Sequence, residues 1–520
     1  MRMLSLRPWV NSTGRLAHRS AAGQWVHRNI PGRWVHQITT VLPSTEVPGP
    51  KCYPLIGSLM DLITSKGFDK ENSYRYFMKL FQIYGPVVKV KFPGQSTMVL
   101  ILKPEDAEKI LQLTKDNPVR KSMEALKKAR YINPYYEKKA GIVVENGEEW
   151  WRVRSKVQAP VLKPQNVLTY LKDMDQVTLD FLDRISRLRN SEGQITVNFQ
   201  EELSKWALES ICLVALNQRV QCFDPSLPSG SQPELIVKAA QTLMNAVKEC
   251  ETGLKLWKIF PTKTFTQLKD SMEILTKTCE AVVHKMEKEM QEKEANNSDY
   301  QPNMVEQLIL EPGLSHKDVI TFMVDLIPGG TETTSDNAAV LLYLIAKNPR
   351  VQAKLQEELD CVLGDGSGNI TPKQLAQLAY TRAVLKESNR LMPPMFGPMR
   401  ILQEDTHLNG HILRKGWSVF LMNALSGWDE EQFPQCSEFV PERWLRHRPL
   451  GNIHPCASLP FSHGIRMCVG RRIAEQELHT LIARIFHRYN LDWKHDDLER
   501  TYKYVFFPKG PMQFTFTERK

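Results

Sequence analysis

A long segment of helical periodicity around residue 330 constrains the fold of this chain more than any other feature. Ser315-His316-Lys317-Asp318 has the form of a helix-capping box, and apolar residues recur at helical spacing from there to Lys347. A helix of about 32 residues is roughly 48 Å long at 1.5 Å per residue. A helix of that length crosses most of a globular protein, so the other elements must pack around it.

The centre of this predicted helix carries residues that are unfavourable in a helix interior. The run reads Pro328-Gly329-Gly330-Thr331-Glu332-Thr333-Thr334. Proline and glycine each cost about 1 kcal/mol or more at such positions. Because strain of this kind clusters at functional sites, the run predicts a site with room for a flat ligand and a small molecule. The alternative is an ordinary kinked helix whose threonines bond back to its own backbone.

A second run presents a single thiol near the C-terminus. Phe461-Ser462-His463-Gly464-Ile465-Arg466-Met467-Cys468-Val469-Gly470 has glycines four residues before and two residues after Cys468, and a helical pattern follows. The N–H groups of a helix N-terminus favour a thiolate over a thiol. A thiolate in that position is a good axial ligand for haem iron. The alternative is a buried structural cysteine, which is the usual role of a lone thiol.

These two runs resemble the cytochrome P-450 superfamily. Phe461-x-x-Gly464-x-Arg466-x-Cys468-x-Gly470 is similar to its haem-binding loop, and Gly329-Gly330-x-Glu332-Thr333-Thr334 is similar to its oxygen-binding groove. The resemblance implies that Cys468 is the axial ligand to the iron of haem b (iron protoporphyrin IX). It implies further cofactor contacts from Phe461, Gly464, Arg466, Gly470, Gly329 and Gly330.

The same resemblance assigns chemistry to the centre of the long helix. It implies that Thr333 holds dioxygen and that Glu332 supplies protons. Three residues depart from the family pattern. We expect Pro328 to sharpen the kink, and Ser462 and His463 to change the hydrogen bonding of the cysteine loop.

Further motifs occur in the order that the family has them. Glu387 and Arg390 stand three residues apart on a predicted helix, a spacing that alone usually marks a surface pair, and Arg443 follows in Pro-Glu-Arg-Trp. The resemblance implies that these three residues form a buried structural lock. It also implies that the propionates of the cofactor are met by Trp150, Arg154, Arg400 and Arg466.

The pair Arg382 and Lys386 lies one helical turn apart on the helix that contains Glu387. Two such cations usually mark a solvated helix face. In mitochondrial cytochromes P-450 this pattern is where an acidic, adrenodoxin-like two-iron ferredoxin docks, and Arg471 and Arg472 add positive charge. The resemblance therefore implies a ferredoxin partner, itself reduced by an NADPH-dependent reductase, with fast and salt-sensitive association.

The first 45 residues hold six arginines and no acidic residue, whereas the whole chain has a net charge of +10. An arginine-rich, acid-free leader is typical of a mitochondrial transit peptide, and the alternative is a disordered basic tail. Because most of the excess charge belongs to the leader, it does not indicate nucleic-acid binding. Nine scattered cysteines without a Cys-x-x-Cys pair favour a reducing compartment.

The length of 520 residues alone would suggest two or more domains. The resemblance instead implies one large, mainly α-helical cytochrome P-450 domain over residues 46–520, with the haem between the long kinked helix and the cysteine loop. Residues 87–92 and 97–102 read as strands of a small β region. Residues 254–261 mix basic and apolar side chains, where an interfacial membrane contact and a plain surface turn are both open.

The expected reaction is insertion of one oxygen atom from O2 into a C–H bond of a small lipophilic substrate. Relatives of this kind act on steroids, secosteroids such as vitamin D, or ecdysteroids, on the matrix side of the inner mitochondrial membrane. One alternative is a haem-thiolate isomerase or peroxygenase that needs no ferredoxin. Others are a mitochondrial enzyme that oxidises foreign compounds and a non-catalytic haem- or lipid-binding protein.

Overall fold

A computed structural model describes residues 46–64, 73–224, 226, 228–252, 255–296, 300–503 and 505–519. The predicted leader, residues 1–45, and Leu254 lie outside the described residues. Within the described ranges, no helix combines the length and apolarity that crossing a membrane requires.

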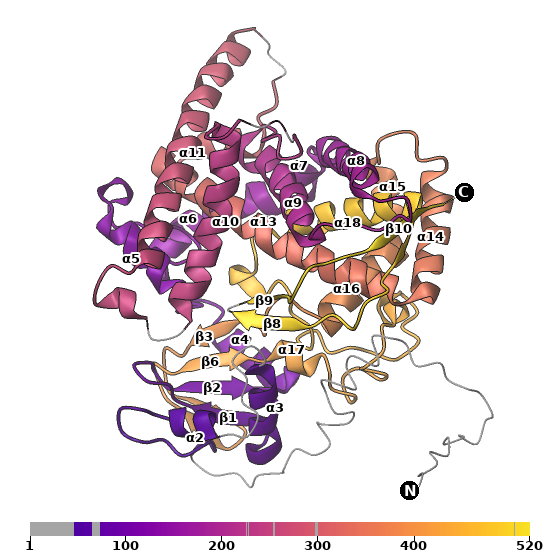
Figure 1. Cartoon of the computed structure of the whole chain (residues 1–520). Helices are drawn as coiled ribbons and strands as arrows, with labels where there is room; N and C mark the ends of the chain where they lie inside the picture. The colour runs from indigo at the N-terminus through magenta and orange to yellow at the C-terminus, as the bar shows by residue number, and fades with distance from the viewer. Residues whose placement is uncertain are drawn as a thin grey trace, which may run out of the picture.

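The central element is helix α13 (His316–Ala346), which crosses the middle of the molecule (Figure 1). The predicted capping box is confirmed. The Ser315 hydroxyl accepts from the Asp318 N–H, and the Asp318 carboxylate accepts from the Ser315 N–H at 2.8 Å. The helix is continuous over its 31 residues and includes Pro328.

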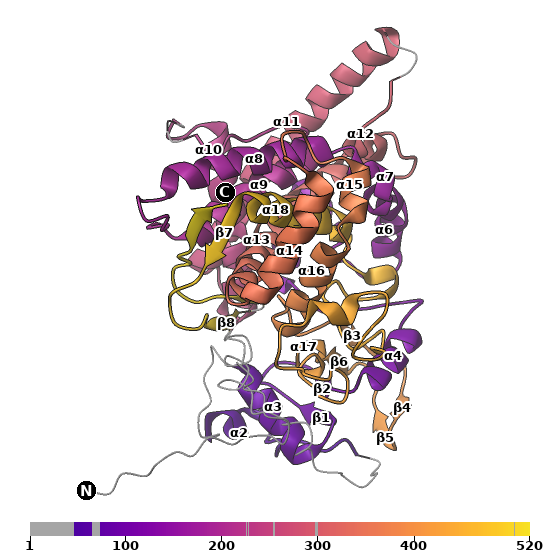
Figure 2. The same ribbon diagram turned by 90° about the vertical axis from the view of Figure 1, so that its right-hand side faces the viewer.

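Three long helices cover one side of α13: α9 (Phe199–Leu216), α10 (Gln232–Glu251) and α11 (Lys263–Asn296). The closest crossing is with α9. A Cβ atom at Gly330 would lie 2.6 Å from Cγ1 of Ile211, so only glycine lets the two helices approach this far. The C-terminal part of α11 projects beyond the rest of the molecule in both views (Figures 1 and 2).

A second group of helices lies on the other side of α13, where α14, α15, α16 and α18 stack (Figure 2). Their bounds are α14 (Pro349–Leu363), α15 (Pro372–Gln377), α16 (Ala379–Leu391) and α18 (Arg471–Arg488). The remaining helices are α2 (Leu59–Thr64), α3 (Ser73–Tyr84), α4 (Pro104–Leu113), α5 (Glu124–Ile132), α6 (Gly147–Leu162), α7 (Pro164–Leu168), α8 (Leu171–Leu188), α12 (Met304–Ile309) and α17 (Asn423–Ser426). Short 3-10 turns are η3 (Pro134–Tyr136), η4 (Leu256–Lys258), η5 (Pro441–Trp444) and η6 (Gly464–Arg466).

The β structure is small, as predicted, and its largest sheet lies at one end of the molecule (Figure 1). This sheet has the order β1-β2-β6-β3, with β2 and β6 parallel and the other pairs antiparallel. Its strands are β1 (Val87–Val90), β2 (Met98–Ile101), β6 (Ser418–Leu421) and β3 (Met399–Ile401). Three two-stranded sheets pair β4 (Thr406–Leu408) with β5 (His411–Leu413), β7 (Tyr489–Asp492) with β10 (Thr515–Glu518), and β8 (Arg500–Lys503) with β9 (Val505–Pro508).

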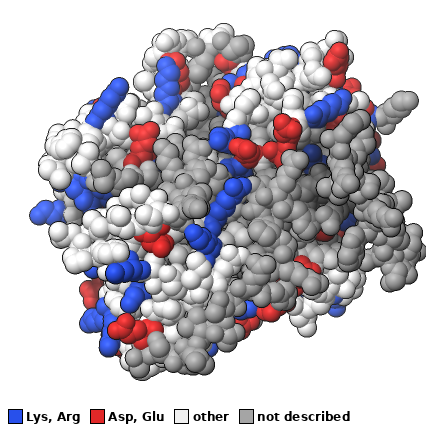
Figure 3. Space-filling view, turned by 60° about the horizontal axis from the view of Figure 1, so that its bottom comes forward, with Lys and Arg blue, Asp and Glu red and all other residues white. Residues whose placement is uncertain are grey.

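In the view from the end of the molecule that carries the four-stranded sheet, the described basic and acidic side chains are interspersed (Figure 3).

Two large clusters of buried apolar side chains meet along α13. Residues 338–346 of α13 belong to the cluster that includes parts of α3, α8, α9, α16 and α18. Residues 319–327 belong to the cluster that includes parts of α5, α6, α10 and α11. Because one helix runs through both clusters, the helical body forms a single mainly α unit, as the fold prediction required.

Candidate active site

The cysteine loop turns back on itself just before α18. The Cys468 N–H donates to the Phe461 carbonyl at 2.9 Å, and Gly470 is the N-cap residue of α18. Gly464 has a φ of 75°, and Ser462 has a φ of 62°. The serine therefore occupies a left-handed conformation that costs an L-residue roughly 1–2 kcal/mol, and its buried hydroxyl has no partner among the described residues. This is the structural consequence of the departure at Ser462.

Cys468 is exposed, unlike most of the other cysteines of the described chain. Burial raises the pKa of this thiol, while the N–H groups of Gly470 and Arg471 and the charge of Arg154 lower it. Cys468 is therefore not closed into a packed core. A structural cysteine of the usual kind would be closed on all sides.

Three buried arginines from different elements gather beside this loop. They are Arg154 of α6, Arg400 of β3 and Arg466 of η6. Burial, and the positive charges of Arg120, Arg400 and Arg154, lower the pKa of Arg466 to about 8. Burial is also the main reason that the pKa values of Arg154 and Arg400 fall to about 10.

The three arginines lack carboxylate partners within the part of the chain that the structure describes. Their guanidinium groups donate to uncharged acceptors, for example Arg154 to the Met467 carbonyl at 2.9 Å and Arg466 to the Asn146 amide oxygen at 2.8 Å. The Nε atoms of Arg154 and Arg466 are buried and have no hydrogen-bond partner in the described structure. A buried positive cluster of this kind requires an anion.

This donor set fits the predicted haem. Two propionates would supply the missing negative charge, and guanidinium groups bind carboxylates in two-point fashion. Cys468 offers one sulfur ligand toward the same interior. When bound, a haem with thiolate ligation supplies the activation of dioxygen.

Trp150 is the inward-facing indole of α6. Its side chain is 3% exposed, whereas that of Trp151 is 44% exposed. The Arg466 guanidinium lies over the Trp150 ring, 4.7 Å from its centroid. Because Arg154 follows one turn later on the same helix, the structure brings Trp150, Arg154 and Arg466 together; their contact with the cofactor stays a prediction.

The centre of α13 is uncovered at Gly329. This residue is exposed within a buried stretch of helix, and a Cβ atom there would meet nothing within 4 Å. The Thr333 hydroxyl donates to the Gly329 carbonyl at 2.7 Å. Thr333 therefore stands one turn from the open glycine and keeps its oxygen lone pairs for a further donor.

Glu332 is held by a different helix. Its Oε1 atom lies 2.6 Å from the Lys248 ammonium on α10, and its Oε2 atom is buried without a partner in the described structure. The motif did not indicate this ion pair, because Lys248 is 84 residues away. Lys248 is therefore part of the surroundings in which Glu332 would transfer a proton.

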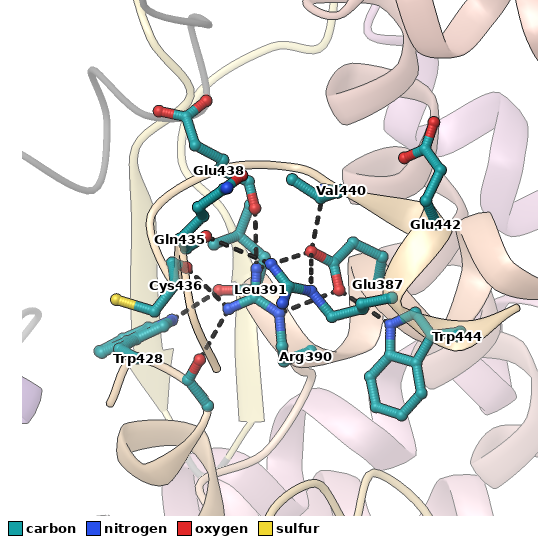
Figure 4. Close-up of polar contacts among 12 residues, drawn as sticks. Glu387, Arg390, Leu391, Trp428, Gln435, Cys436, Glu438, Val440, Glu442 and Trp444 are labelled. Carbon is teal, nitrogen blue, oxygen red and sulfur yellow. Dashed lines mark hydrogen bonds and ion pairs between the residues drawn. The ribbon is translucent and has the colours of Figure 1, made fainter. Parts of the chain in front are cut away.

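Glu387, Arg390 and Arg443 meet in one buried network (Figure 4). The Glu387 carboxylate accepts from Arg390 Nε and Nη2 at 3.0 and 2.8 Å, from Arg443 Nε at 3.0 Å and from the Val440 N–H at 3.0 Å. A fifth donor is the Trp444 indole N–H at 2.8 Å. Sequence reasoning missed this role of Trp444, although the residue directly follows Arg443.

Arg390 extends this network into the loop before η5. It donates to the carbonyl oxygens of Gly427, Cys436 and Glu438 at 2.7–2.9 Å. The side chains of Glu387 and Arg390 are fully buried. The network therefore ties α16 to the segment that leads toward the cysteine loop.

The four predicted docking cations line one groove of about 640 Å³ beside the cysteine loop. We call it the basic groove. Arg382 and Lys386 reach it from α16, and Arg471 and Arg472 reach it from the start of α18. Phe461, Ser462 and His463 also line it, so the groove adjoins the loop that carries Cys468. The prediction did not include Glu475, which lines the groove as well.

Comparison with known proteins places the chain in a family. The family model "Cytochrome P450" matches residues 47–516. "Probable cytochrome P450 49a1" of Drosophila melanogaster is 32% identical over 92% of this chain and 83% of its own length. "Cytochrome P450 302a1, mitochondrial" of the same organism is 31% identical over 91% and 94%. "1,25-dihydroxyvitamin D(3) 24-hydroxylase, mitochondrial" of Mus musculus is 31% identical over 86% and 84%. Together with the thiol loop, the arginine cluster and the helical fold, these matches show that the chain belongs to the cytochrome P450 family of haem-thiolate monooxygenases.

Proposed function

We propose that this protein is a mitochondrial monooxygenase that takes electrons from an acidic two-iron ferredoxin and hydroxylates a steroid, secosteroid or ecdysteroid-like lipid. The observation that carries the proposal is the basic groove beside the cysteine loop. A cationic groove there suits a small acidic electron carrier, because complementary charge speeds association and lets the carrier leave quickly. Relatives that are named mitochondrial, among them the vitamin D 24-hydroxylase, support the location and the substrate class.

Within this proposal, the residues of the site divide the work between two sides of the cofactor. Cys468 would ligate the iron, and Arg154, Arg400 and Arg466 would bind the propionates beside Trp150. Phe461, Gly464 and Gly470 shape the loop around the ligand sulfur, and Gly329 and Gly330 leave space on the α13 side. The arginine cluster and the exposure of Cys468 and Gly329 support these roles.

Two residues of α13 handle protons in this proposal. The Thr333 hydroxyl accepts through its free lone pairs, and it can donate toward dioxygen, as a relay requires, only after it leaves the Gly329 carbonyl. Glu332 delivers protons inward, and its Oε1 atom lies 2.6 Å from the Lys248 ammonium on α10.

The chain is proposed to comprise a transit peptide at residues 1–45 and a catalytic domain at residues 46–520, bound peripherally to the matrix side of the inner membrane. The described part of the 254–261 segment supports the membrane contact. Ile259 is 82% exposed, and Leu256 and Phe260 are also exposed, whereas Trp257 is buried. Lys255 and Lys258 lie beside these apolar side chains but pair with Glu124 at 2.9 and 3.0 Å, so the exposed apolar side chains carry the proposed interfacial contact.

The test is a reconstituted reaction with the purified holoenzyme, a mitochondrial two-iron ferredoxin, its reductase and NADPH. A panel of steroids, secosteroids, ecdysteroids and foreign compounds is screened by haem spectral shift and by mass spectrometry of products. We expect a product that has gained one oxygen atom from labelled O2, only with ferredoxin present, from a member of the first three classes. Product formation with peroxide but not with reduced ferredoxin would instead identify a peroxygenase. Turnover of foreign compounds alone would remove the proposed substrate class.

A further inference from the structure

The basic groove contains a carboxylate of its own. Glu475 lies on α18, and its Oε1 atom is 2.8 Å from Arg471 Nε. Its Oε2 atom is 3.6 Å from Arg472 Nη1, and its side chain is 20% exposed. Among the described residues that line the groove, Glu475 is the only acidic one. The two α18 arginines are therefore already partly neutralised.

The two cations of α16, Arg382 and Lys386, have partners of a different kind. Arg382 donates to the Leu375 carbonyl at 3.0 Å, and Lys386 lies over the Trp444 ring at 6.0 Å. Neither forms an ion pair within the described part of the chain. The groove therefore has two half-sites: one on α16 without an ion pair, where the Glu475 charge is felt only by Lys386 at longer range, and one on α18 whose arginines pair directly with Glu475.

We propose that Glu475 is an internal competitor of the ferredoxin carboxylates, holding Arg471 and Arg472 until an acidic side chain of the partner shares or replaces it. This inference rests on the proposed ferredoxin docking. Exchange of one carboxylate for another gains little, and Glu475 also repels the incoming charge. Docking is thus anchored on α16 and weakened on α18, which favours rapid release of a carrier that delivers electrons one at a time.

The size of the effect follows from charge in a partly solvated groove. Glu475→Gln removes one negative charge and keeps the side-chain volume. At the distances of such a groove, that change tightens the binding of an acidic partner about threefold to tenfold at low ionic strength. The gain shrinks with added salt, because the Debye length falls from about 30 Å at 0.01 M to about 8 Å at 0.15 M.

The experiment measures Kd and the dissociation rate of an oxidised mitochondrial two-iron ferredoxin on the immobilised holoenzyme by surface plasmon resonance. Glu273→Gln is the matched control, because Glu273 also pairs at a spacing of four residues, with Lys277 at 2.7 Å on exposed α11. We expect Glu475→Gln to lower Kd threefold to tenfold at low salt by slowing dissociation, and Glu273→Gln to leave it unchanged. Soret and circular dichroism spectra verify that both variants are folded and loaded.

A second comparison does not depend on the Glu475 variant. Arg471→Gln is expected to weaken ferredoxin binding less than Arg382→Gln, because only Arg471 already has an internal carboxylate. An unchanged or weaker affinity of Glu475→Gln, or equal losses for the two arginine variants, would overturn the inference and assign Glu475 the role of holding the arginines in place. Absence of salt-sensitive ferredoxin binding to the wild-type enzyme would instead refute the proposed electron donor, and this inference with it.

Discussion

Replacement of Glu387 by glutamine tests the buried network between α16 and η5. The substitution keeps the shape of the side chain but removes the negative charge that faces Arg390 and Arg443. Both guanidinium groups are at most 1% exposed, and the amide of glutamine would turn N–H groups toward their N–H groups. Two buried cations are then left without their carboxylate.

The expected loss in the free energy of unfolding is large for a single substitution. Removing one partner of a buried ion pair costs about 3–5 kcal/mol, against a total stability of about 5–15 kcal/mol for a typical domain. Unfolding entropy is about 2.1 cal/mol/K per residue, which gives roughly 1 kcal/mol/K for a domain of about 470 residues. We therefore expect Glu387→Gln to lower Tm by about 3–5 °C.

The pH dependence of this loss has a definite sign. Burial alone would raise the pKa of Glu387, but the charges and hydrogen bonds of Arg390 and Arg443 more than offset burial, so the pKa is lowered. A carboxylate with a lowered pKa stabilises the folded state above its unfolded pKa, and this stability is lost as the pH falls through the folded pKa. The difference in Tm between wild type and Glu387→Gln should be full at pH 7 and should shrink in acid, below about pH 4.

The assay is thermal unfolding of the holoenzyme at a fixed scan rate, with haem content measured in parallel. Glu289→Gln is the control, since Glu289 pairs with Lys285 at 3.7 Å on the exposed face of α11 and should contribute at most about 1 kcal/mol. A Tm for Glu387→Gln within 1 °C of this control would refute the argument that the buried carboxylate holds the two arginines.

Three further outcomes are expected. Gly330→Ala should destabilise the fold by about 1–3 kcal/mol in a denaturant titration, because its Cβ would overlap Ile211, whereas Gly329→Ala, with nothing within 4 Å, should not. Burial raises the pKa of Asp336 to about 8, so between pH 5 and 7 the folded state binds a proton that the unfolded state has lost. The stability of the wild type relative to Asp336→Asn should therefore fall by about 1.4 kcal/mol per pH unit over this range. Parallel curves of stability against pH for the two proteins would contradict this. Arg466→Gln should speed haem transfer to apomyoglobin roughly 10-fold to 100-fold, the worth of one charge-assisted hydrogen bond, and an unchanged rate would remove Arg466 from the cofactor site.

The sequence was most informative where the structure is decided locally. The capping box of α13 depends on residues three apart. From there to the end of the helix, the spacing of the apolar residues predicts which side chains are buried. The cysteine loop is likewise a short run whose turn and N-cap are set by its own glycines. Such features can be predicted because the groups that satisfy each other are neighbours in the chain.

Partners that are distant in the chain could not be predicted in this way. Lys248 faces Glu332, and Arg120 adds its charge to the arginine cluster, but no periodicity indicates which surfaces of two helices or loops will meet. Strands β2 and β6 pair in parallel although more than 300 residues separate them. The competing position of Glu475 also escaped prediction, because a spacing of four residues on a helix reads as an ordinary surface pair.

The arginine cluster links folding to cofactor loading. Arg154, Arg400 and Arg466 come from a helix, a strand and a loop, and each is buried with a lowered pKa. Charges held together in this way oppose folding unless an anion joins them. An anionic cofactor that binds only the folded state stabilises it by RT ln(1 + [L]/Kd). Cofactor binding and the packing of the helix, strand and loop that carry the arginines are therefore coupled. The buried Glu387 network holds the chain that leads into the cysteine loop by charges that the protein supplies itself, whereas the three arginines beside the loop form no ion pair within the described residues.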